Sequence, residues 1–229
     1  MLKKVITYFF QNRSIKNHLP AVQLEGETLN QVSNTKFLGV RIDENLNWKY
    51  HIDDVCLKLS KVCGILYKIR NSLTNESLLS IYYTLCYPHL TYCVSIWGST
   101  WPSFLHSLTV AQNKVVRCMF MLHKFESVTN IMSSMNILKF HSIHKFFSLL
   151  LLYKMYHSEV DIFRVINYSR DTRSNNVDFV CPQFRTVLFK NSIICTAPKL
   201  FNSLPLHLKQ LIKTNRYSKF KYETRKFIS

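Results

Sequence analysis

The spacing of apolar residues along the chain changes near residue 50. Before that point the apolar residues lie in short runs that are typical of strands, and Glu25-Gly26-Glu27 is a hairpin signal between the first two runs. Beyond His51 the apolar residues recur at alternating spacings of three and four, which predicts one long amphipathic helix. This apolar stripe consists of Ile52, Val55, Leu59, Val62, Leu66, Ile69 and Leu73.

Helical patterns continue through the middle of the chain. A second helix is expected to open near Thr74, and Pro88 should kink or end it, because proline removes a backbone donor. Pro102 suits the first turn of a third helix, Ser127 can cap a short fourth one, and residues 141–157 form a strongly apolar fifth. The chain is therefore expected to be mainly helical beyond residue 48.

The most apolar segment, residues 146–153, lies between Lys145 and Lys154. A helix that spans a membrane needs about twenty apolar residues, so this shorter segment is expected to be a core helix. Residues 1–10 run into polar residues without the order of a signal peptide. The seven cysteines include no Cys-x-x-Cys pair. We therefore expect an intracellular, reducing location, nuclear or cytoplasmic, without a zinc site or a disulfide framework.

The last part of the chain has a weaker pattern. Residues 169–178 are rich in Ser, Asn, Asp and Arg, which is typical of a linker or a surface loop. Short strands are expected at residues 179–181 and 192–195, and helical pieces at residues 198–202 and 218–227.

Charge narrows the choice of partner. Thirty Lys and Arg against thirteen Asp and Glu give a formal net charge of +17. So basic a protein repels itself unless an anionic partner screens it; nucleic acid is the commonest such partner and an acidic membrane surface is second. A basic but otherwise ordinary surface is the third interpretation. Residues 185–229 are the most cationic part, with ten Lys or Arg and one acid.

Five cations lie on predicted helices, outside their apolar stripes. Lys58, Lys61 and Lys68 lie on a different side of the long helix from its apolar residues. A helix of this kind can pack on its own domain while it offers cations to a phosphate backbone. Lys114 and Arg117 are expected on the outer side of the third helix. The alternative is a solvated basic face without a partner.

Gly39 interrupts the last strand-like run, in a chain that has only four glycines. A missing side chain at this point permits a β-bulge or a close approach of another group to the backbone. A loose glycine in an edge strand is the alternative.

The segment Lys36-Phe37-Leu38-Gly39-Val40-Arg41-Ile42-Asp43 resembles the region that closes the palm and opens the thumb of reverse transcriptases from jockey-like non-LTR retrotransposons. Other residues resemble further blocks of these enzymes, in the same order along about residues 20–229. They are Leu46, Trp48, His51, Ile52, Tyr82, Pro88, His89, Leu90, Tyr92, Ile96, Trp97, Gly98, Gln112, Arg117, Thr172, Arg173, Ser174, Pro182, Arg185, Thr186, Ala197, Pro198, Lys199, Leu200, Asn202, Ser203, Leu204, Pro205, Lys219, Phe220 and Lys221.

The resemblance implies an architecture. It implies a mainly α fold with a small amino-terminal β-hairpin or sheet (α+β), in which a helical thumb-like bundle precedes a loop-rich basic carboxy-terminal region. The expected domains are a remnant of the palm with a primer-grip hairpin (residues 1–48), a helical thumb-like domain (49–158) and the basic region (159–229).

The resemblance also implies a nucleic-acid-binding role. The hairpin would hold the growing 3′ end, and the thumb helices would clamp a duplex through its shape and phosphates, without sequence preference. The implied partners are RNA, DNA or an RNA/DNA hybrid, together with the palm and fingers of a parent polymerase, and not a membrane. The implied contact residues are Lys36, Phe37, Leu38, Gly39, Lys58, Lys61, Lys68, Lys114 and Arg117.

Nucleotide polymerisation requires carboxylates that hold two divalent ions. The family carries an aromatic-Ala-Asp-Asp hairpin upstream of the primer grip, whereas no acid precedes Glu25 here. The adjacent pair Asp53-Asp54 is interpreted as acids in the first turn of the long helix. His141 and His144 share a helix face but lack a third metal ligand at suitable spacing. We therefore expect no catalytic residue, no cofactor and no polymerisation by this chain alone, with Mg²⁺ needed only in the full-length parent enzyme.

Three hypotheses remain at this point. The chain is a truncated product of a mobile element with nonspecific affinity for RNA or DNA, or a domesticated adaptor that binds nucleic acid or a protein without enzymatic activity. The third hypothesis is an all-helical scaffold whose sixteen Phe and twelve Tyr merely fill a core.

Overall fold

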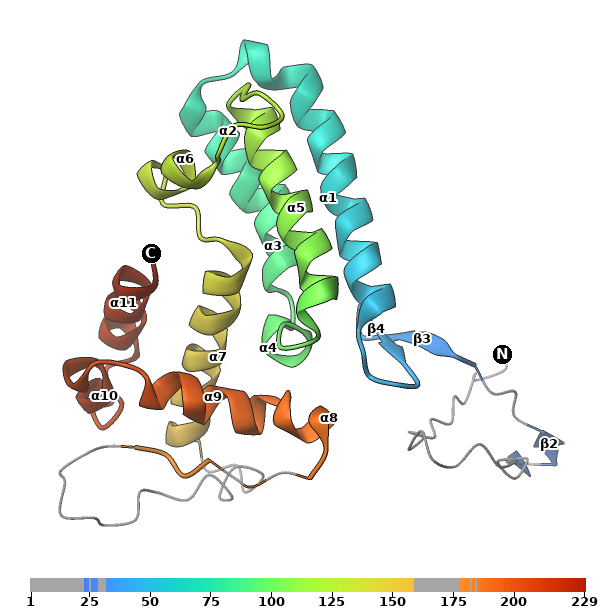
Figure 1. Ribbon diagram of the computed structural model, residues 1–229, viewed down its shortest axis with the longest axis vertical. Coiled ribbons are helices and arrows are strands. Elements are labelled where there is room, and N and C mark those ends of the chain that lie inside the picture. The colour runs from blue at the N-terminus through green and yellow to red at the C-terminus, as the bar shows by residue number, and fades with distance from the viewer. Residues whose placement is uncertain (1–22, 25, 29–31, 159–177, 182, 184) are drawn as a thin grey trace.

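The computed structural model describes residues 23–24, 26–28, 32–158, 178–181, 183 and 185–229 (Figure 1). The linker predicted at residues 169–178 lies almost wholly outside these ranges. The strands are β1 (Gln23–Leu24), β2 (Glu27–Thr28), β3 (Asn34–Phe37) and β4 (Val40–Asp43). The helices are α1 (Lys49–Ile69), η1 (Arg70–Ser72), α2 (Asn75–Ile81), η2 (Tyr82–Cys86), α3 (Tyr87–Thr91), α4 (Val94–Trp97), α5 (Pro102–Met119), α6 (Thr129–Ser134), α7 (Phe140–His157), α8 (Val187–Lys190), α9 (Ile193–Asn202), α10 (Leu206–Leu211) and α11 (Tyr217–Ile228).

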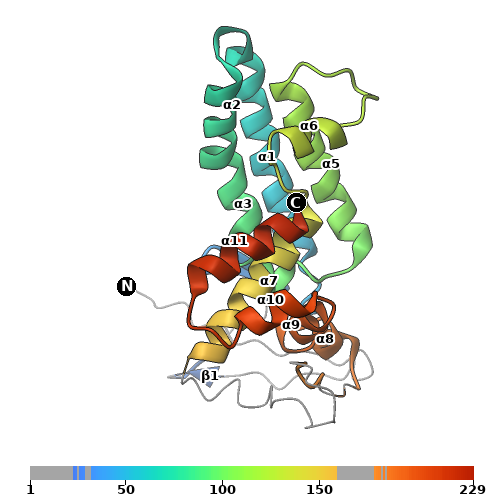
Figure 2. The same cartoon turned by 90° about the vertical axis from the view of Figure 1, so that its left-hand side faces the viewer.

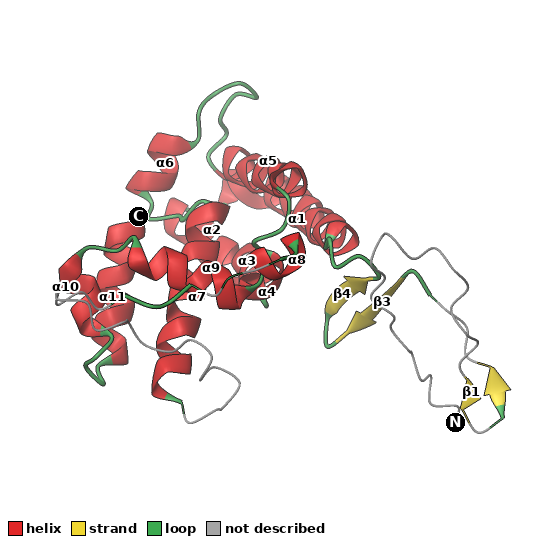
Figure 3. Cartoon of the chain, turned by 60° about the horizontal axis from the view of Figure 1, so that its bottom comes forward, coloured by secondary structure: helices red, strands yellow, loops and turns green. Residues whose placement is uncertain are grey.

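The predicted class, mainly α with a small β region at the amino-terminal end, is confirmed. Figure 3 shows β3 and β4 beside the start of α1 and the helices gathered into the body of the molecule. Among the described residues, no helix combines the length and the apolar character that are needed to cross a lipid bilayer.

Two antiparallel hairpins precede α1. The first pairs β1 with β2 around Gly26, which confirms the predicted turn. The second pairs β3 with β4, and its two central residues, Leu38 (φ 45°) and Gly39 (φ 85°), have the left-handed backbone of a type I′ turn. A bulge at Gly39 is therefore the wrong prediction. The close approach is confirmed, because a Cβ atom at Gly39 would lie 3.3 Å from Cε1 of Tyr92.

Asp43 joins this hairpin to α1. Its carboxylate is buried and accepts hydrogen bonds from the backbone N–H groups of Asn45, Asn47 and Trp48, at 3.1, 3.1 and 2.8 Å. Three charge-assisted bonds fix the turn that leads into the helix. Sequence reasoning gave Asp43 no such role.

The first-turn role predicted for Asp53-Asp54 is wrong. The helix begins at Lys49 and its first turn contains no acid, so both carboxylates lie in the second turn. The Asp54 carboxylate instead forms an ion pair with Arg41 of β4, with an N–O distance of 2.9 Å. This ion pair ties the hairpin to α1.

The first hydrophobic core lies among α1, α2, η2, α3, α4 and α5 (Figure 2). The predicted stripe of α1 lines it from Ile52 to Leu66, whereas Ile69 is half-buried and Leu73 is exposed beyond the helix end. Gln112 of α5 is fully buried in this core. Its Nε2 donates to the Tyr82 hydroxyl at 2.9 Å and to the Leu138 carbonyl at 2.8 Å. Its Oε1 accepts from the Phe140 N–H at 2.8 Å, so the amide links three segments.

The predicted helix boundaries in the middle of the chain are mostly confirmed. Thr74 caps α2 and accepts from the Ser77 N–H. Helical structure does not end at Pro88, because α2, η2 and α3 follow one another up to Thr91; Pro88 lies in the first turn of α3, just after the π-helical turn η2. Pro102 opens α5. For α6 the predicted cap is displaced: Val128 occupies the cap position, and Ser127 precedes it.

The second core lies between α7, α9, α10 and α11. Helix α7 contributes to both cores, with Phe140 and Ile143 in the first and Phe146 in the second. The division at residue 158 stays a prediction.

The strand predicted at residues 192–195 is wrong. Ser192 caps α9, which begins at Ile193 and packs on α7. The β-branched pair Ile193-Ile194 suggested a strand, but burial of the apolar side of α9 outweighs a propensity difference of a few tenths of a kcal/mol. Of the strand predicted at residues 179–181, a single bridge at Phe179 is present.

Candidate nucleic-acid interface

Helix α1 presents an outer stripe of five residues that lie on one line, away from the core. The stripe consists of Tyr50, Leu57, Lys61, Gly64 and Lys68, and all five are exposed. The spacings of seven, four, three and four are those of neighbours along one side of an α-helix. Leu57 is 62% exposed, which is high for a leucine in a helix that is packed along its other side. The stripe therefore combines two cations with uncovered apolar groups.

Gly64 lies between the two lysines of the outer stripe. A Cβ atom at this position would meet no other atom within 4 Å, so nothing in the fold requires a glycine there. A glycine inside a helix costs about 0.5–1 kcal/mol relative to alanine. An unexplained glycine on an exposed helix line leaves the backbone open to a close approach from outside the molecule.

Lys58 is the least exposed of the three lysines predicted on α1. Burial lowers the pKa of His51 to about 4 and also lowers the pKa of His89. The positive charge of Lys58 adds to the effect of burial at both histidines. Lys58 is half-buried, whereas Lys61 and Lys68 are exposed. The structure brings Lys61 and Lys68 onto one line and sets Lys58 beside it.

Helix α5 packs along α1 and carries the other two predicted cations. The carbonyl oxygen of Lys114 lies 3.9 Å from Sγ of Cys63 on α1. The Lys114 side chain is exposed beside this contact between α5 and α1. Arg117 is half-buried, and its Nε donates to the Glu126 carbonyl at 3.0 Å. One donor of Arg117 is thus used within the protein, whereas Lys114 is exposed beside α1.

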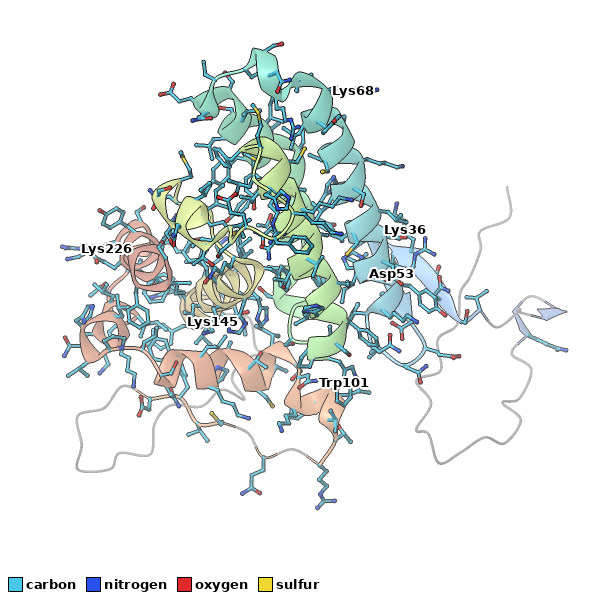
Figure 4. The ribbon with its side chains drawn as sticks, turned by 45° about the horizontal axis from the view of Figure 1, so that its top comes forward. Lys36, Asp53, Lys68, Trp101, Lys145 and Lys226 are labelled. Carbon is cyan, nitrogen blue, oxygen red and sulfur yellow. The ribbon has the colours of Figure 1, made fainter. Side chains whose placement is uncertain are left out.

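The β3–β4 hairpin carries the remaining predicted residues. Phe37 and Leu38 are 59% and 74% exposed, and Lys36 is exposed as well. Figure 4 shows Lys36 beside the first half of α1 and Lys68 at its far end. The Tyr92 hydroxyl donates to the Leu38 carbonyl at 2.5 Å, so the exposed tip of the hairpin is attached to the end of α3.

Several of the resembling residues around this surface build its scaffold. Trp97 is fully buried and donates from Nε1 to the Tyr92 carbonyl at 2.8 Å. The buried ring of His51 packs edge-on against Trp97, with a centroid distance of 5.1 Å. Gly98 is needed for packing, because a Cβ atom there would lie 2.6 Å from Cδ2 of His144.

The described residues do not fit the divalent ions of a polymerase. They contain no group of three or more His, Cys, Asp or Glu side chains that could hold a metal ion. Asp54, the nearest acid to the hairpin on α1, is already paired with Arg41. The seven cysteines are all free thiols.

The described surface therefore presents two exposed lysines on one line of α1, with Lys114 exposed on the neighbouring helix. The chain is similar to RNA-directed DNA polymerases of mobile elements. The probable enzyme from transposon X-element of Drosophila melanogaster is 31% identical over 101 residues, which are 43% of this chain and 11% of that protein. The enzyme from mobile element jockey of Drosophila funebris is 28% identical over 102 residues, with the same two shares of 43% and 11%. The probable enzyme from transposon BS of Drosophila melanogaster is 25% identical over 118 residues, 50% of this chain and 13% of that protein.

These relatives confirm the resemblance to reverse transcriptases of jockey-like elements. The matched regions span between 11% and 13% of the relatives' own length. No protein-family model matches the chain, and no solved structure matches it.

Proposed function

We propose that the outer stripe of α1 grips the sugar-phosphate backbone of a nucleic-acid duplex, as the thumb part of an RNA-directed DNA polymerase. The observation that carries this proposal is the exposed Gly64 between Lys61 and Lys68, at a point where the fold leaves open space. The similarity to RNA-directed DNA polymerases supports a nucleic-acid ligand.

The chemistry of the stripe suits a backbone rather than a base sequence. Lysine is a flexible point charge that contacts phosphates at many geometries, and such contacts position a duplex without reading it. Gly64 lets the helix approach a shallow groove, and the exposed Leu57 can contact sugar carbons there. Lys36 and the hairpin tip extend the same surface past the start of α1, where we place the 3′ end of a primer. We assign the stripe a role in binding, through its two lysines and its exposed apolar groups.

Charge reversal tests the proposal. The triple variant Lys58→Glu/Lys61→Glu/Lys68→Glu is expected to lower the affinity for an RNA/DNA hybrid duplex by about tenfold or more at moderate salt. Each lost phosphate contact should also reduce the slope of log affinity against log salt by about 0.9, so the slope should fall by about 2–3. Fluorescence anisotropy over a salt series measures both quantities.

A matched variant separates local contacts from net charge. Lys124, Lys139 and Lys213 are exposed on other parts of the molecule, and their reversal to Glu gives the same change in net charge. This control is expected to keep most of the duplex affinity and nearly all of the salt slope. Equal losses in the two triple variants would refute the placement on α1, provided that circular dichroism shows both to be folded.

A further inference from the structure

The carboxy-terminal helix α11 carries a second cationic surface that the proposed function does not use. Lys219, Tyr222 and Lys226 recur at spacings of three and four and therefore lie on one line, whereas Lys221 directly precedes Tyr222 and lies about 100° around the helix from it. All four side chains are exposed, and Tyr222 is 67% exposed. We define these four residues as the α11 basic face.

The basic face is presented by a helix that is firmly attached. Phe220 is fully buried and stacks on Tyr153 of α7, with a centroid distance of 4.8 Å and an interplanar angle of 28°. Tyr217 contacts the same ring at 5.6 Å. At the other end of α11, the Ser142 hydroxyl donates to the Ile228 carbonyl at 3.3 Å. The side of α11 opposite the basic face is therefore occupied by the protein itself.

The lysines of the basic face are not neutralised by short contacts. Within the described residues, Lys219, Lys221 and Lys226 form no ion pair, and Glu223, the acid on α11, pairs with none of them. Arg225 differs, because its Nη2 lies 3.4 Å from the Asn136 carbonyl. Two unpaired ammonium groups thus flank one exposed ring along the helix, and a third lies on the adjoining side of α11.

We infer that the α11 basic face binds single-stranded nucleic acid. Lysines attract the phosphates, and an exposed aromatic ring between them offers a stacking surface to bases, which are accessible only when the strand is unpaired. Lys219 and Lys226 lie about 10 Å apart along the helix axis, at about 1.5 Å for each residue, so they flank the Tyr222 ring on both sides. Neighbouring phosphates of one strand can then contact the lysines while a base contacts the ring.

A membrane is the weaker choice of partner. A basic amphipathic helix binds lipid by burying its apolar side in the bilayer, and in α11 that side is buried against α7 instead. Figures 1 and 2 place α11 on the side of the molecule away from α1. The two surfaces are therefore separate, and a bound duplex on α1 would leave the α11 basic face open to an unpaired strand.

The experiment compares two triple variants against two ligands. Lys219→Glu/Lys221→Glu/Lys226→Glu is expected to lower the affinity for a labelled oligouridylate about tenfold or more and to reduce its salt slope by about 2. Its affinity for the hybrid duplex should change much less. The α1 triple variant, with the same net charge, should lose affinity for the hybrid duplex and keep most of its affinity for the oligouridylate. An oligothymidylate arm distinguishes an RNA strand from a DNA strand as the ligand.

Tyr222→Ser tests stacking separately from charge. It should weaken oligouridylate binding by roughly tenfold, whereas Tyr222→Phe should keep the affinity, because stacking needs the ring and not the hydroxyl. Unchanged single-strand affinity in the α11 triple variant would overturn the inference, and so would equal losses for strand and duplex. Loss of binding to phosphatidylserine vesicles with no change for the oligouridylate would overturn it in favour of lipid. Failure of the α1 proposal is separate, since it would appear as intact duplex binding in the α1 variant.

Discussion

The hydroxyl group of Tyr92, at the end of α3, donates a hydrogen bond of 2.5 Å to the carbonyl oxygen of Leu38, at the tip of the β3–β4 hairpin. The two residues are 54 positions apart in the chain. The ring of Tyr92 also occupies the space that a side chain at position 39 would need. The hydroxyl group of Tyr92 thus holds the exposed hairpin tip, and its ring leaves too little space for a side chain at Gly39.

Removal of this hydroxyl should loosen the hairpin without unfolding the helical body. Tyr92→Phe is expected to lower the free energy that holds the hairpin in place by about 1 kcal/mol, the usual net worth of one hydrogen bond. Hydrogen exchange of residues 34–43 should therefore become faster. Tyr67→Phe serves as a control, because Tyr67 is exposed on α1 and contacts Arg70 through its ring, which phenylalanine keeps. Equal exchange in Tyr92→Phe and wild type would show that the bond does not hold the hairpin.

Gly64→Ala should separate stability from binding. Alanine fits without contact at this position and favours the helix, so the free energy of unfolding is expected to rise by up to about 1 kcal/mol. The added methyl group should at the same time weaken duplex binding, because it blocks the closest approach to α1. Urea unfolding and anisotropy measure the two effects. Ser80→Ala on α2 is the control, with better helix propensity and unchanged affinity. A Gly64→Ala protein that binds as tightly as wild type would contradict the role of Gly64.

Gln112→Leu should destabilise the first core strongly. The amide makes three buried hydrogen bonds, and the variant leaves the Leu138 carbonyl and the Phe140 N–H without a partner. A loss of about 2–4 kcal/mol in the free energy of unfolding is expected, because buried unpaired groups cost about 1–3 kcal/mol each. Urea unfolding measures it. The matched substitution Gln210→Leu changes an exposed residue of α10. It should change the free energy of unfolding by no more than about 0.5 kcal/mol. Similar losses in the free energy of unfolding for Gln112→Leu and Gln210→Leu would refute the role of Gln112 in linking the three segments.

Local pattern predicted much of this fold. The spacing of apolar residues identified α1, α5 and α7, since their buried sides are continuous along the sequence. The type I′ turn at Leu38-Gly39 was missed, because its first position holds Leu and not the Asn, Asp or Gly that such turns favour. The helix at Ile193 was missed, because strand and helix propensities there differ by less than the packing energy that decides between them. Asp43 shows the same limit: its partners are backbone N–H groups, which have no signature in side-chain pattern.

The candidate site was only partly predictable. Lys61 and Lys68 were identified because a lysine off an apolar stripe faces outward. Gly64 and Leu57 were missed, because whether a glycine is needed for packing, or a leucine is covered, depends on neighbours from other helices. Some residues that carry the family resemblance, such as Trp97 and Gln112, are buried and hold the scaffold together, whereas others, such as Leu38, are exposed. The buried ones identify a fold more directly than a binding surface.

Two buried histidines predict how the fold responds to acid. His51 and His144 are 4% and 7% exposed, and Nε2 of each has no hydrogen-bond partner among the described residues. Burial lowers the pKa of each from 6.5 to about 4; nearby Lys58 adds to the effect at His51, and His141 and Lys145 add to it at His144. Asp54 opposes the shift at His51 but is weaker than burial and Lys58 together.

Because the unfolded chain takes up protons at these positions near pH 6.5 and the folded chain only near pH 4, acid favours unfolding. The contribution of the neutral rings to stability is complete above pH 6.5 and is lost as the pH falls toward 4. Each unit of pKa difference corresponds to about 1.4 kcal/mol, so the decline should be easy to detect. Urea unfolding at a series of pH values between these limits measures it, and the double variant His51→Gln/His144→Gln should show a flatter dependence. A free energy of unfolding that stays constant across this range in the wild-type protein would mean that both rings are protonated without disturbing the core.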